Sequence, residues 1–422
     1  MKNLLLLFFL VASVCMSSQS TPDLIIKDAN ILSMTNSTVV MNKSVAVKNG
    51  KILQIDDFNK IKKDKNCKVI EAKGKFLMPG LAEMHSHLPD ENKADTVLLR
   101  NVAAGVTHLR VMNADLDQVA LKKRLESNDK SISPKLHYSF ILTKDNKYTE
   151  AQFDSLMLEI KKSGLSFIKL FSIANEETFD NLMNSANKNK VIVCGHFPGS
   201  INIEKVIYSG FKSIEHVGGL DKIRDSSALL ISILHTKEKE VFNCPTLDWD
   251  IMACNLQYPR EYKHRLIYYN APKHYLHRWE TEYNKTINET GQEKILATKE
   301  KYLPSFKNKE KILKALYENN CLLIVGSDPG GVFQMEGFNM YEEMLNWSKA
   351  GIDNYTILKS ATTNPALFFN EQDKWGTIEI GKDADMIILR KNPLEDIINI
   401  RTIETTILNG NIYKKTDLLK KM

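Results

Sequence analysis

Eight apolar runs of strand length occupy the middle of the chain, and stretches with apolar residues at helical spacing separate them. The stretch EAQFDSLMLEIKKSG at residues 150–164 is typical of these helices. In chain order, the runs are FLMPGLAEM, GVTHLRVM, KLHYSFILT, SFIKLFS, KVIVCGH, KSIEHV, EVFNCPTL and CLLIVGSD. Eight strand-then-helix units predict an α/β fold with a (β/α)8 TIM barrel over residues 79–372.

Both ends of the chain differ from this middle part and are predicted to form short strands. The dipeptide Asn-Gly lies between apolar arms at residues 49–50 and again at residues 409–410. This dipeptide is a strong signal for a tight β-hairpin. We therefore expect residues 21–78 and 373–422 to form one small composite β-sandwich domain built from both termini.

One connection of the predicted barrel is oversized, from about residue 248 to about residue 310. It is polar, charged and aromatic, and connections of this length are usually lids or peripheral insertions. His274 and His277 in this insertion have a spacing that could suit a metal site on a helix. Their many charged neighbours instead favour a solvated helix face.

The first 20 residues have the features of a secretory signal peptide. Lys2 is followed by an apolar run, residues 4–14, and then by small polar residues. The run is too short to span a bilayer, and no later segment is long and apolar enough to do so. We expect a secreted or periplasmic protein. A lipid anchor at Cys15 is the alternative, but Val14 stands where lipoprotein signals usually carry a small residue.

Charge and cysteine content narrow the class of protein further. The 57 basic and 51 acidic residues give a net charge of +6, and the lysines are scattered rather than clustered. This pattern predicts a solvated surface and no nucleic-acid partner. Cys194, Cys244 and Cys321 lie in apolar runs and are expected to be buried thiols. Cys67 and Cys254 could form a disulfide in an oxidising compartment. No feature indicates an oligomeric state.

Ionisable residues end or interrupt several of the predicted barrel strands. They are His85, His87, Lys169, His196, His216 and Asp328. Active sites of such barrels lie at the C-terminal ends of the strands, and two histidines at i and i+2 of one strand point to the same side. A single histidine at a strand end is more often structural, but the conjunction favours a metal site. His108 and His137 fall inside strands and are expected to be structural or to support the ligands.

Several motifs together resemble the metal-dependent amidohydrolase superfamily. They are MPGLAEMHSHL, SIEHV, GSD, SATTNPALFF and GTIEIGKDADMIIL, and the resemblance runs from about Asp23 to about Lys414. The sequence is most similar to the imidazolonepropionase-like and Xaa-Pro dipeptidase-like branch. The resemblance implies a site with two divalent metal ions, with zinc as the default and manganese, iron or cobalt as alternatives.

The resemblance also implies a role for each residue of the site. His85, His87 and Asp328 match the ligands of the more buried metal, and His196 and His216 match those of the second metal. Lys169 matches a lysine that reacts with CO2 and bridges both ions as a carbamate. An ammonium in an apolar strand would be costly, and an anionic carbamate removes that problem.

The activity implied by the resemblance is hydrolysis of an amide bond in a small molecule, such as a dipeptide, an N-acyl amino acid or a cyclic amide. Water activated by the metals attacks the carbonyl, and Asp328 accepts its proton and passes it to the leaving amine. Alternatives are a mononuclear deaminase or ring-opening hydrolase, an esterase or lactonase, and a catalytically silent binding protein of the same fold. Lys169 argues against the mononuclear alternatives, and the presence of all six site residues argues against the silent protein.

The sequence departs from this branch near the site. Glu83 precedes the histidine pair where an aspartate is frequent, and Asn113 and the turn FPGS after His196 also differ, which leaves peptide specificity open. Arg110 lies near the end of the second strand. It could contact an anionic substrate, or it could be a structural arginine paired within the barrel.

Overall fold

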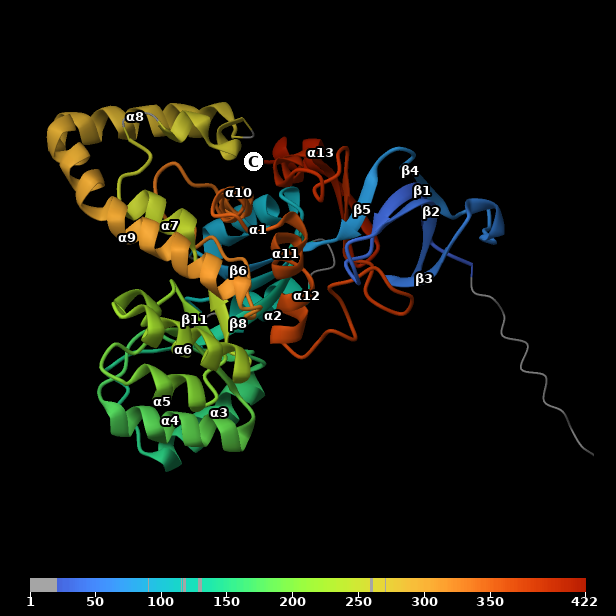
Figure 1. The fold of residues 1–422 in the computed structure, drawn as a ribbon. Coiled ribbons are helices and arrows are strands. Elements are labelled where there is room, and N and C mark those ends of the chain that lie inside the picture. The colour runs from blue at the N-terminus through green and yellow to red at the C-terminus, as the bar shows by residue number, and fades with distance from the viewer. Residues whose placement is uncertain are drawn as a thin grey trace, which may run out of the picture.

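The computed structural model describes residues 21–89, 91–114, 116, 119–127, 131–258, 261–269 and 271–422. The predicted signal peptide and Cys15 lie outside these residues. The described chain forms a barrel with an outer layer of helices and a separate mixed sheet beside it (Figure 1).

Seven parallel strands form the wall of the barrel, and each pairs with the next in chain order. They are β6 (Leu81–Ser86), β7 (Val106–Val111), β8 (Lys135–Leu142), β9 (Phe167–Leu170), β10 (Ile192–His196), β11 (Ser213–Glu215) and β12 (Phe242–Cys244). The eighth predicted run, CLLIVGSD, does not form a regular strand, but it still closes the wall. On one side, Leu323 makes an isolated bridge to Asn243 of β12. On its other side, Met84 N donates to Val325 O at 3.0 Å. The predicted (β/α)8 barrel is therefore confirmed.

Helices surround the barrel and follow its strands. They are α1 (Glu91–Ala103), α2 (Val119–Ser127), α3 (Glu150–Ser163), α4 (Glu176–Asn189), α5 (Ile203–Tyr208), α6 (Ser226–Glu238), α10 (Asn339–Lys349), α11 (Asn354–Ser360) and α12 (Thr363–Phe368). Helix α3 shows why the sequence folds this way. Thr149 and Gln152 form a capping box at its start, and Gly164 ends it with φ 71°. Phe153, Met157 and Ile160 lie on one face of the helix and are buried.

Strands from both ends of the chain form one mixed sheet, here called the terminal sheet. Its strands are β1 (Leu24–Leu32), β2 (Val39–Lys48), β3 (Lys51–Asp56), β4 (Lys68–Glu71), β5 (Phe76–Pro79), β13 (Met386–Leu389), β14 (Ile403–Leu408) and β15 (Asn411–Lys414). The Asn-Gly dipeptides form both predicted hairpin turns, with φ values of 49° and 73° at residues 49–50 and of 49° and 76° at residues 409–410. Positive φ at both positions is what a two-residue hairpin turn requires.

The first predicted strand is divided between the two sheets, which corrects the sequence prediction. In FLMPGLAEM, β5 belongs to the terminal sheet and β6 to the barrel, and Gly80 lies between them. A Cβ atom on Gly80 would lie 2.3 Å from the side chain of Thr107. The close approach of the barrel wall at this point explains why a glycine stands at the change of sheet.

The long insertion folds into helices rather than an irregular loop. These are α7 (Leu247–Ala253), η4 (Glu261–His264), η5 (Leu266–Tyr269), α8 (Lys273–Thr290) and α9 (Gln292–Glu318). Helices α8 and α9 form an arm that projects from the barrel, and the C-terminal part of α9 returns to it (Figure 1). Buried aromatic rings hold the insertion, with Tyr262 stacked on Phe333 at 4.3 Å between ring centroids. His274 and His277 are exposed on α8, as the charged neighbours predict.

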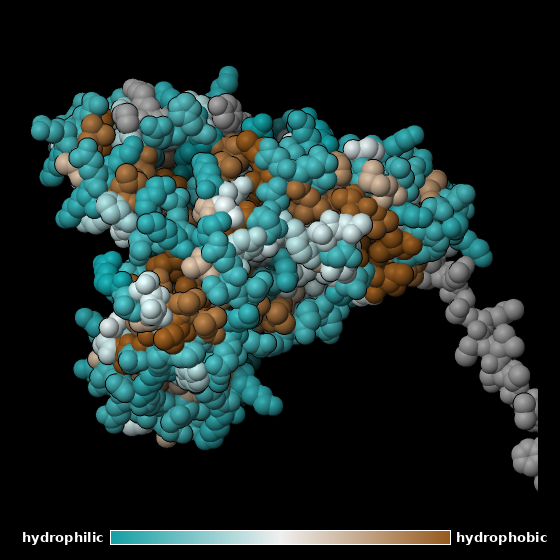
Figure 2. Space-filling view, in the orientation of Figure 1, coloured by the Kyte–Doolittle hydropathy of each residue, from teal (hydrophilic) through white to brown (hydrophobic). Residues whose placement is uncertain are grey.

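Short elements complete the fold, namely η1 (Phe58–Lys60), η3 (Leu220–Lys222), η6 (Ile397–Thr402) and α13 (Lys415–Leu419). The five cysteines of the described chain are free, so the disulfide considered between Cys67 and Cys254 does not form. Cys194, Cys244 and Cys321 are buried thiols, as expected. The face drawn in Figure 2 is largely hydrophilic. Among the described helices, none combines the length and apolarity needed to cross a bilayer.

Candidate active site

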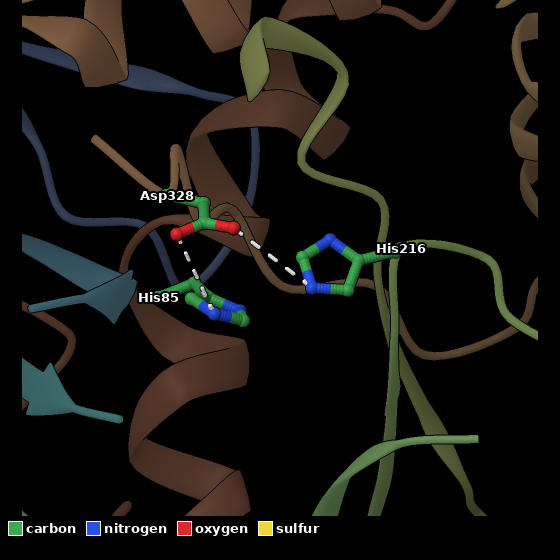
Figure 3. Close-up of side chains that lie close together, drawn as sticks. All are labelled: His85, His216 and Asp328. Atoms are coloured by element: carbon green, nitrogen blue, oxygen red, sulfur yellow. Dashed lines mark ion pairs between the residues drawn. The ribbon is translucent and has the colours of Figure 1, made fainter. Parts of the chain in front are cut away.

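His85, His216 and Asp328 converge at the C-terminal end of the barrel strands, and they are here called the His–Asp cluster (Figure 3). His85 lies on β6, His216 directly follows β11, and Asp328 ends the eighth run. Asp328 Oδ1 lies 3.8 Å from His85 Nε2, and Asp328 Oδ2 lies 3.9 Å from His216 Nε2. One ligand atom from each residue lies within 4.8 Å of the others, a spacing that suits one metal ion.

His87 also reaches the cluster, whereas His196 lies at its edge. His87 Nε2 donates to Asp328 Oδ1 at 2.9 Å. The ring of His196 lies 5.0 Å from the ring of His216, measured between centroids. Phe171 and Trp249 are half exposed and flank these two rings, at 4.9 Å from His196 and 5.9 Å from His216. The aromatic pair was not predicted, because neither residue has a distinctive sequence pattern.

The hydrogen bonds of three histidines fix the same tautomer. His85 Nδ1 donates to Glu215 Oε2 at 2.9 Å, and His196 Nδ1 donates to the carbonyl of Phe171 at 3.1 Å. His216 Nδ1 contacts Thr246 Oγ1 at 2.6 Å. The Thr246 hydroxyl donates to the carbonyl of Pro245 at 2.8 Å, so it must accept from His216. In each ring the Nε2 lone pair therefore remains available as a metal ligand.

The charges of the cluster also suit a divalent cation. Burial lowers the pKa of His85 and of His216 well below the usual range, so both are neutral at pH 7. Burial opposes the ionisation of Asp328, but the neighbouring imidazole of His85 and the hydrogen bond from His87 hold its pKa at about 2. Metal ligands must be neutral imidazoles and ionised carboxylates, and these residues have that form.

Several residues of the site have an uncommon backbone conformation. The φ angles of His216, Thr246 and Asp328 are 61°, 52° and 48°. Positive φ costs free energy in residues other than glycine and is often found at functional sites. The surrounding bonds hold these residues in place, including the bond from Asp328 N to the carbonyl of His85 at 2.9 Å.

A buried ion pair supports the cluster from inside the barrel. Glu215 is 0% exposed, and both of its oxygens accept from Arg110 Nη2, at 2.9 and 2.8 Å. Burial disfavours the charge of Glu215, but the Arg110 guanidinium lowers its pKa, so the carboxylate stays ionised beside His85. Sequence reasoning missed Glu215 as a support, although it adjoins His216 in SIEHV.

Arg110 is therefore the structural arginine that the sequence left open, and it does not line the site for an anionic substrate. Its side chain is 0% exposed, and its guanidinium also donates to Ser213 Oγ at 3.0 Å and to the carbonyl of Met84. Glu83 has a related role on β6. Its carboxyl accepts from His85 N at 3.0 Å and from Ser327 N at 2.9 Å, which ties the first strand to the eighth run.

Lys169 lies on β9 inside the barrel and is 2% exposed. Within the described part of the chain, its ammonium has no hydrogen bond or ion pair. Burial lowers its pKa, although the charge of Glu215 opposes this shift. Gly195 lies close against β9, because a Cβ at this position would clash with the backbone oxygen of Leu170 and lie 2.8 Å from Lys169 Cδ. The lysine is thus packed inside the barrel, and its ammonium bonds to no described residue.

His108 and His137 do not belong to the candidate metal site. They lie beside the C-terminal segment. Their rings stack on Trp375 and Phe369, with centroid distances of 3.6 and 3.8 Å. His108 Nε2 lies 3.4 Å from Asp385 Oδ2. These contacts connect the barrel to the segment that leads into the terminal sheet. This arrangement matches the structural role predicted for both histidines.

A (β/α)8 barrel with a His–Asp cluster at the C-terminal rim defines a class of enzymes that use bound divalent metal ions. The model of the Amidohydrolase family matches residues 76–413 of this chain. The chain therefore belongs to the Amidohydrolase family, and it is an enzyme of the class predicted from the sequence.

Two curated relatives match short parts of the chain. An imidazolonepropionase of Thermoplasma acidophilum is 38% identical over 65 residues, which cover 14% of this chain and 16% of the relative. A dihydroorotase of Elusimicrobium minutum is 35% identical over 82 residues, which cover 19% of this chain and 18% of the relative. The chain thus aligns with less than a fifth of either relative's length.

Solved structures match almost the whole fold. A Xaa-Pro dipeptidase with bound methionine in its active site has a TM-score of 0.69 and 17% identity, over 93% of this chain and 99% of that one. Bottromycin amidohydrolase has a TM-score of 0.69 and 16% identity, over 94% of this chain and 88% of that one. At these identities, the matches establish the shared fold and leave the substrate open.

Proposed function

We propose that this protein hydrolyses an amide bond of a small molecule, in a dipeptide, an N-acyl amino acid or a cyclic amide, at a centre of two divalent metal ions. The observation that carries the proposal is the convergence of the His–Asp cluster beside buried Lys169, whose ammonium bonds to no residue of the described part of the chain. Family membership supports hydrolysis, and the geometry supports a cationic cofactor.

The residues present fit such a centre. His85, His87 and Asp328 would hold one ion, and His196 and His216 would hold the other. Zinc is the default for imidazole-rich sites. When bound, the ions would supply Lewis-acid activation of water and of the substrate carbonyl. Nζ of neutral Lys169 would attack the carbon of CO2 and lose a proton, and the resulting carbamate would supply anionic oxygen ligands.

Asp328 is the residue best placed to move a proton. It is ionised at neutral pH, and its two oxygens face His85 and His216. In the proposed reaction, one carboxylate oxygen accepts the proton of the attacking water and delivers it to the nitrogen of the leaving amine. Glu215 and Thr246 hold the imidazoles in the tautomer that leaves Nε2 free.

A mononuclear enzyme of the same fold is the second candidate, either a deaminase or a ring-opening hydrolase. The observation in its favour is that the tightest group contains His85, His216 and Asp328, which would serve a single ion. Hydrolysis of an ester or lactone uses the same machinery, because activated water can attack either type of carbonyl.

The test is to assay the zinc-loaded protein against a library of dipeptides and N-acyl amino acids, with metal content measured in the same samples. Asp328→Asn is expected to abolish turnover while much of the metal stays bound. Lys169→Ala is expected to lower a content of about two ions per chain, because the bridging ligand is lost. No hydrolysis anywhere in the library would refute the peptide assignment. Unchanged activity in Asp328→Asn would refute the role of that residue.

We also propose that residues 1–20 direct export and are removed. The sequence features of a signal peptide support this proposal. Sequencing the N-terminus of the mature protein from its native host tests it. A mature protein that starts at Met1 would refute it, and a lipid on Cys15 would establish the anchored alternative.

A further inference from the structure

A cavity of about 390 Å³ adjoins the candidate metal ligands and is here called the side cavity. Its lining comes from three segments, the end of β10 with the chain after it, the end of β11 with the chain after it, and α9, and includes His196, Phe197, Ile201, His216, Lys222 and Lys309. A substrate that reacts at the His–Asp cluster would therefore extend its remaining atoms into this cavity.

The wall formed after β10 is apolar and firmly packed. Phe197 and Ile201 lie in the connection to α5, and Ile201 is buried. A Cβ atom on Gly218 or Gly219 would lie 2.8 Å from atoms of Phe197, so these glycines let the ring pack against the backbone after β11. This wall suits an apolar group of the substrate.

The insertion contributes one charged group, Lys309, to a cavity that Glu215, Asp221 and Lys222 also line. Lys309 comes from α9, and its side chain is 11% exposed. Its Nζ lies 2.8 Å from both oxygens of Asp250, which is itself buried on α7. Lys309 lines the cavity, and Asp250 is not among the lining residues. An ammonium has three N–H donors, and the third has no partner among the described residues.

We infer that Lys309 binds the carboxylate of the substrate, so that the enzyme acts on N-acyl amino acids or dipeptides whose C-terminal residue is apolar. The inference rests on the proposed amide hydrolysis and names its substrate class. Asp250 orients the ammonium, Lys309 donates its free N–H to the carboxylate, and the wall of Phe197 and Ile201 receives the side chain. A buried lysine held in this way is already ordered before the ligand arrives, which favours binding.

Binding of L-leucine and L-leucinol to the metal-loaded, full-length protein tests this inference directly by calorimetry. The two probes share the amine and the apolar side chain and differ in the carboxylate, and neither can be hydrolysed. Lys309→Met is expected to weaken L-leucine binding at least tenfold and to leave L-leucinol binding unchanged, because a charge-assisted hydrogen bond is lost. Lys222→Met is the matched control. Lys222 lines the same cavity, but its side chain is 79% exposed and pairs with Asp221, so little change is expected.

Removing Lys309 leaves Asp250 buried without its partner and could impair folding. The double variant Lys309→Met with Asp250→Asn removes both charges and keeps the shapes, and it should show the same loss for L-leucine. Lys309→Arg should retain most of the binding. Equal effects on both probes, or no preference of the unaltered protein for L-leucine, would overturn the inference. If no compound of the library is hydrolysed but the protein still prefers L-leucine in a way that depends on Lys309, the proposed reaction is overturned and the carboxylate site is not.

Discussion

Replacing Glu215 with glutamine removes one charge from the centre of the barrel and keeps the shape of the side chain. Oε1 accepts from Arg110 Nη2 at 2.9 Å and from Ser213 Oγ at 2.6 Å. Oε2 accepts from Arg110 Nη2 at 2.8 Å and from His85 Nδ1 at 2.9 Å. In either orientation of the glutamine, its NH2 group faces the guanidinium of Arg110. The NH2 group can accept neither from Arg110 nor from the second donor at its position, which is Ser213 or His85, and a buried cation remains without a counter-charge.

The expected cost follows from this geometry. Breaking a fully buried ion pair by removing one partner typically costs about 3–5 kcal/mol. Loss of the partner that orients a metal-binding histidine typically lowers metal affinity by about 10- to 100-fold. We therefore expect Glu215→Gln to lower the free energy of unfolding by about 3–5 kcal/mol and to weaken zinc binding by at least about tenfold.

Urea unfolding of the metal-free protein and zinc titration against a competing chelator measure these two effects. Glu204→Gln is the matched control, because Glu204 also accepts from a histidine Nδ1 and a serine hydroxyl, those of His235 and Ser232. Its side chain is 38% exposed, so the change should cost less than about 1 kcal/mol. The reasoning is refuted if both variants unfold at the same urea concentration and bind zinc like the unaltered protein.

Three further perturbations follow from the same structure. Gly195→Ala should destabilise the barrel, as measured by urea unfolding, because φ is 133° and the new Cβ would clash with the backbone oxygen of Leu170 and lie 2.8 Å from Lys169 Cδ. An unchanged midpoint would contradict the close packing of β10 against β9 at this point. Thr246→Val should weaken zinc binding by about 10-fold or more, because His216 Nδ1 loses its acceptor. If the variant binds zinc as tightly as the unaltered protein, Thr246 does not support His216 as a ligand. Burial holds the pKa of His137 well below its ordinary value of 6.5. Below pH 6.5 this histidine is protonated in the unfolded chain but not in the folded protein, so the free energy of unfolding decreases as the pH falls. His137→Phe should reduce this loss of stability by at most about 1.4 kcal/mol per pH unit, as measured by urea midpoints at pH 7.5 and 5.5. If the variant and the unaltered protein lose the same stability between these pH values, the prediction is wrong.

The barrel and the hairpins were predictable because they follow from local patterns. The period of apolar residues marks strands and helices, and an Asn-Gly dipeptide specifies its turn by its own backbone preference. The division of the first run at Gly80 was not predictable, because it depends on the distant side chain of Thr107. The irregular form of the eighth run was not predictable either, because it depends on the neighbouring segments of the barrel and not on the composition of the run.

The residues of the His–Asp cluster were predictable because each ends a strand, and the barrel brings strand ends together. The supporting residues were harder to find. Arg110 and Glu215 pair across the inside of the barrel, and their separation in the sequence says nothing of this contact. Lys309 is one of many lysines in a charged insertion, and its position beside the side cavity depends on how α9 returns to the barrel.

The central claim is a two-metal centre bridged by a modified Lys169. The most direct measurement is a crystal structure of the zinc-loaded protein grown with bicarbonate, with anomalous scattering data collected at the zinc edge. We expect two anomalous peaks, one among His85, His87 and Asp328 and one beside His196 and His216, and carboxylate density extending from Lys169 Nζ between them. A single peak within the His–Asp cluster together with an unmodified Lys169 amine would contradict the claim and establish the mononuclear alternative.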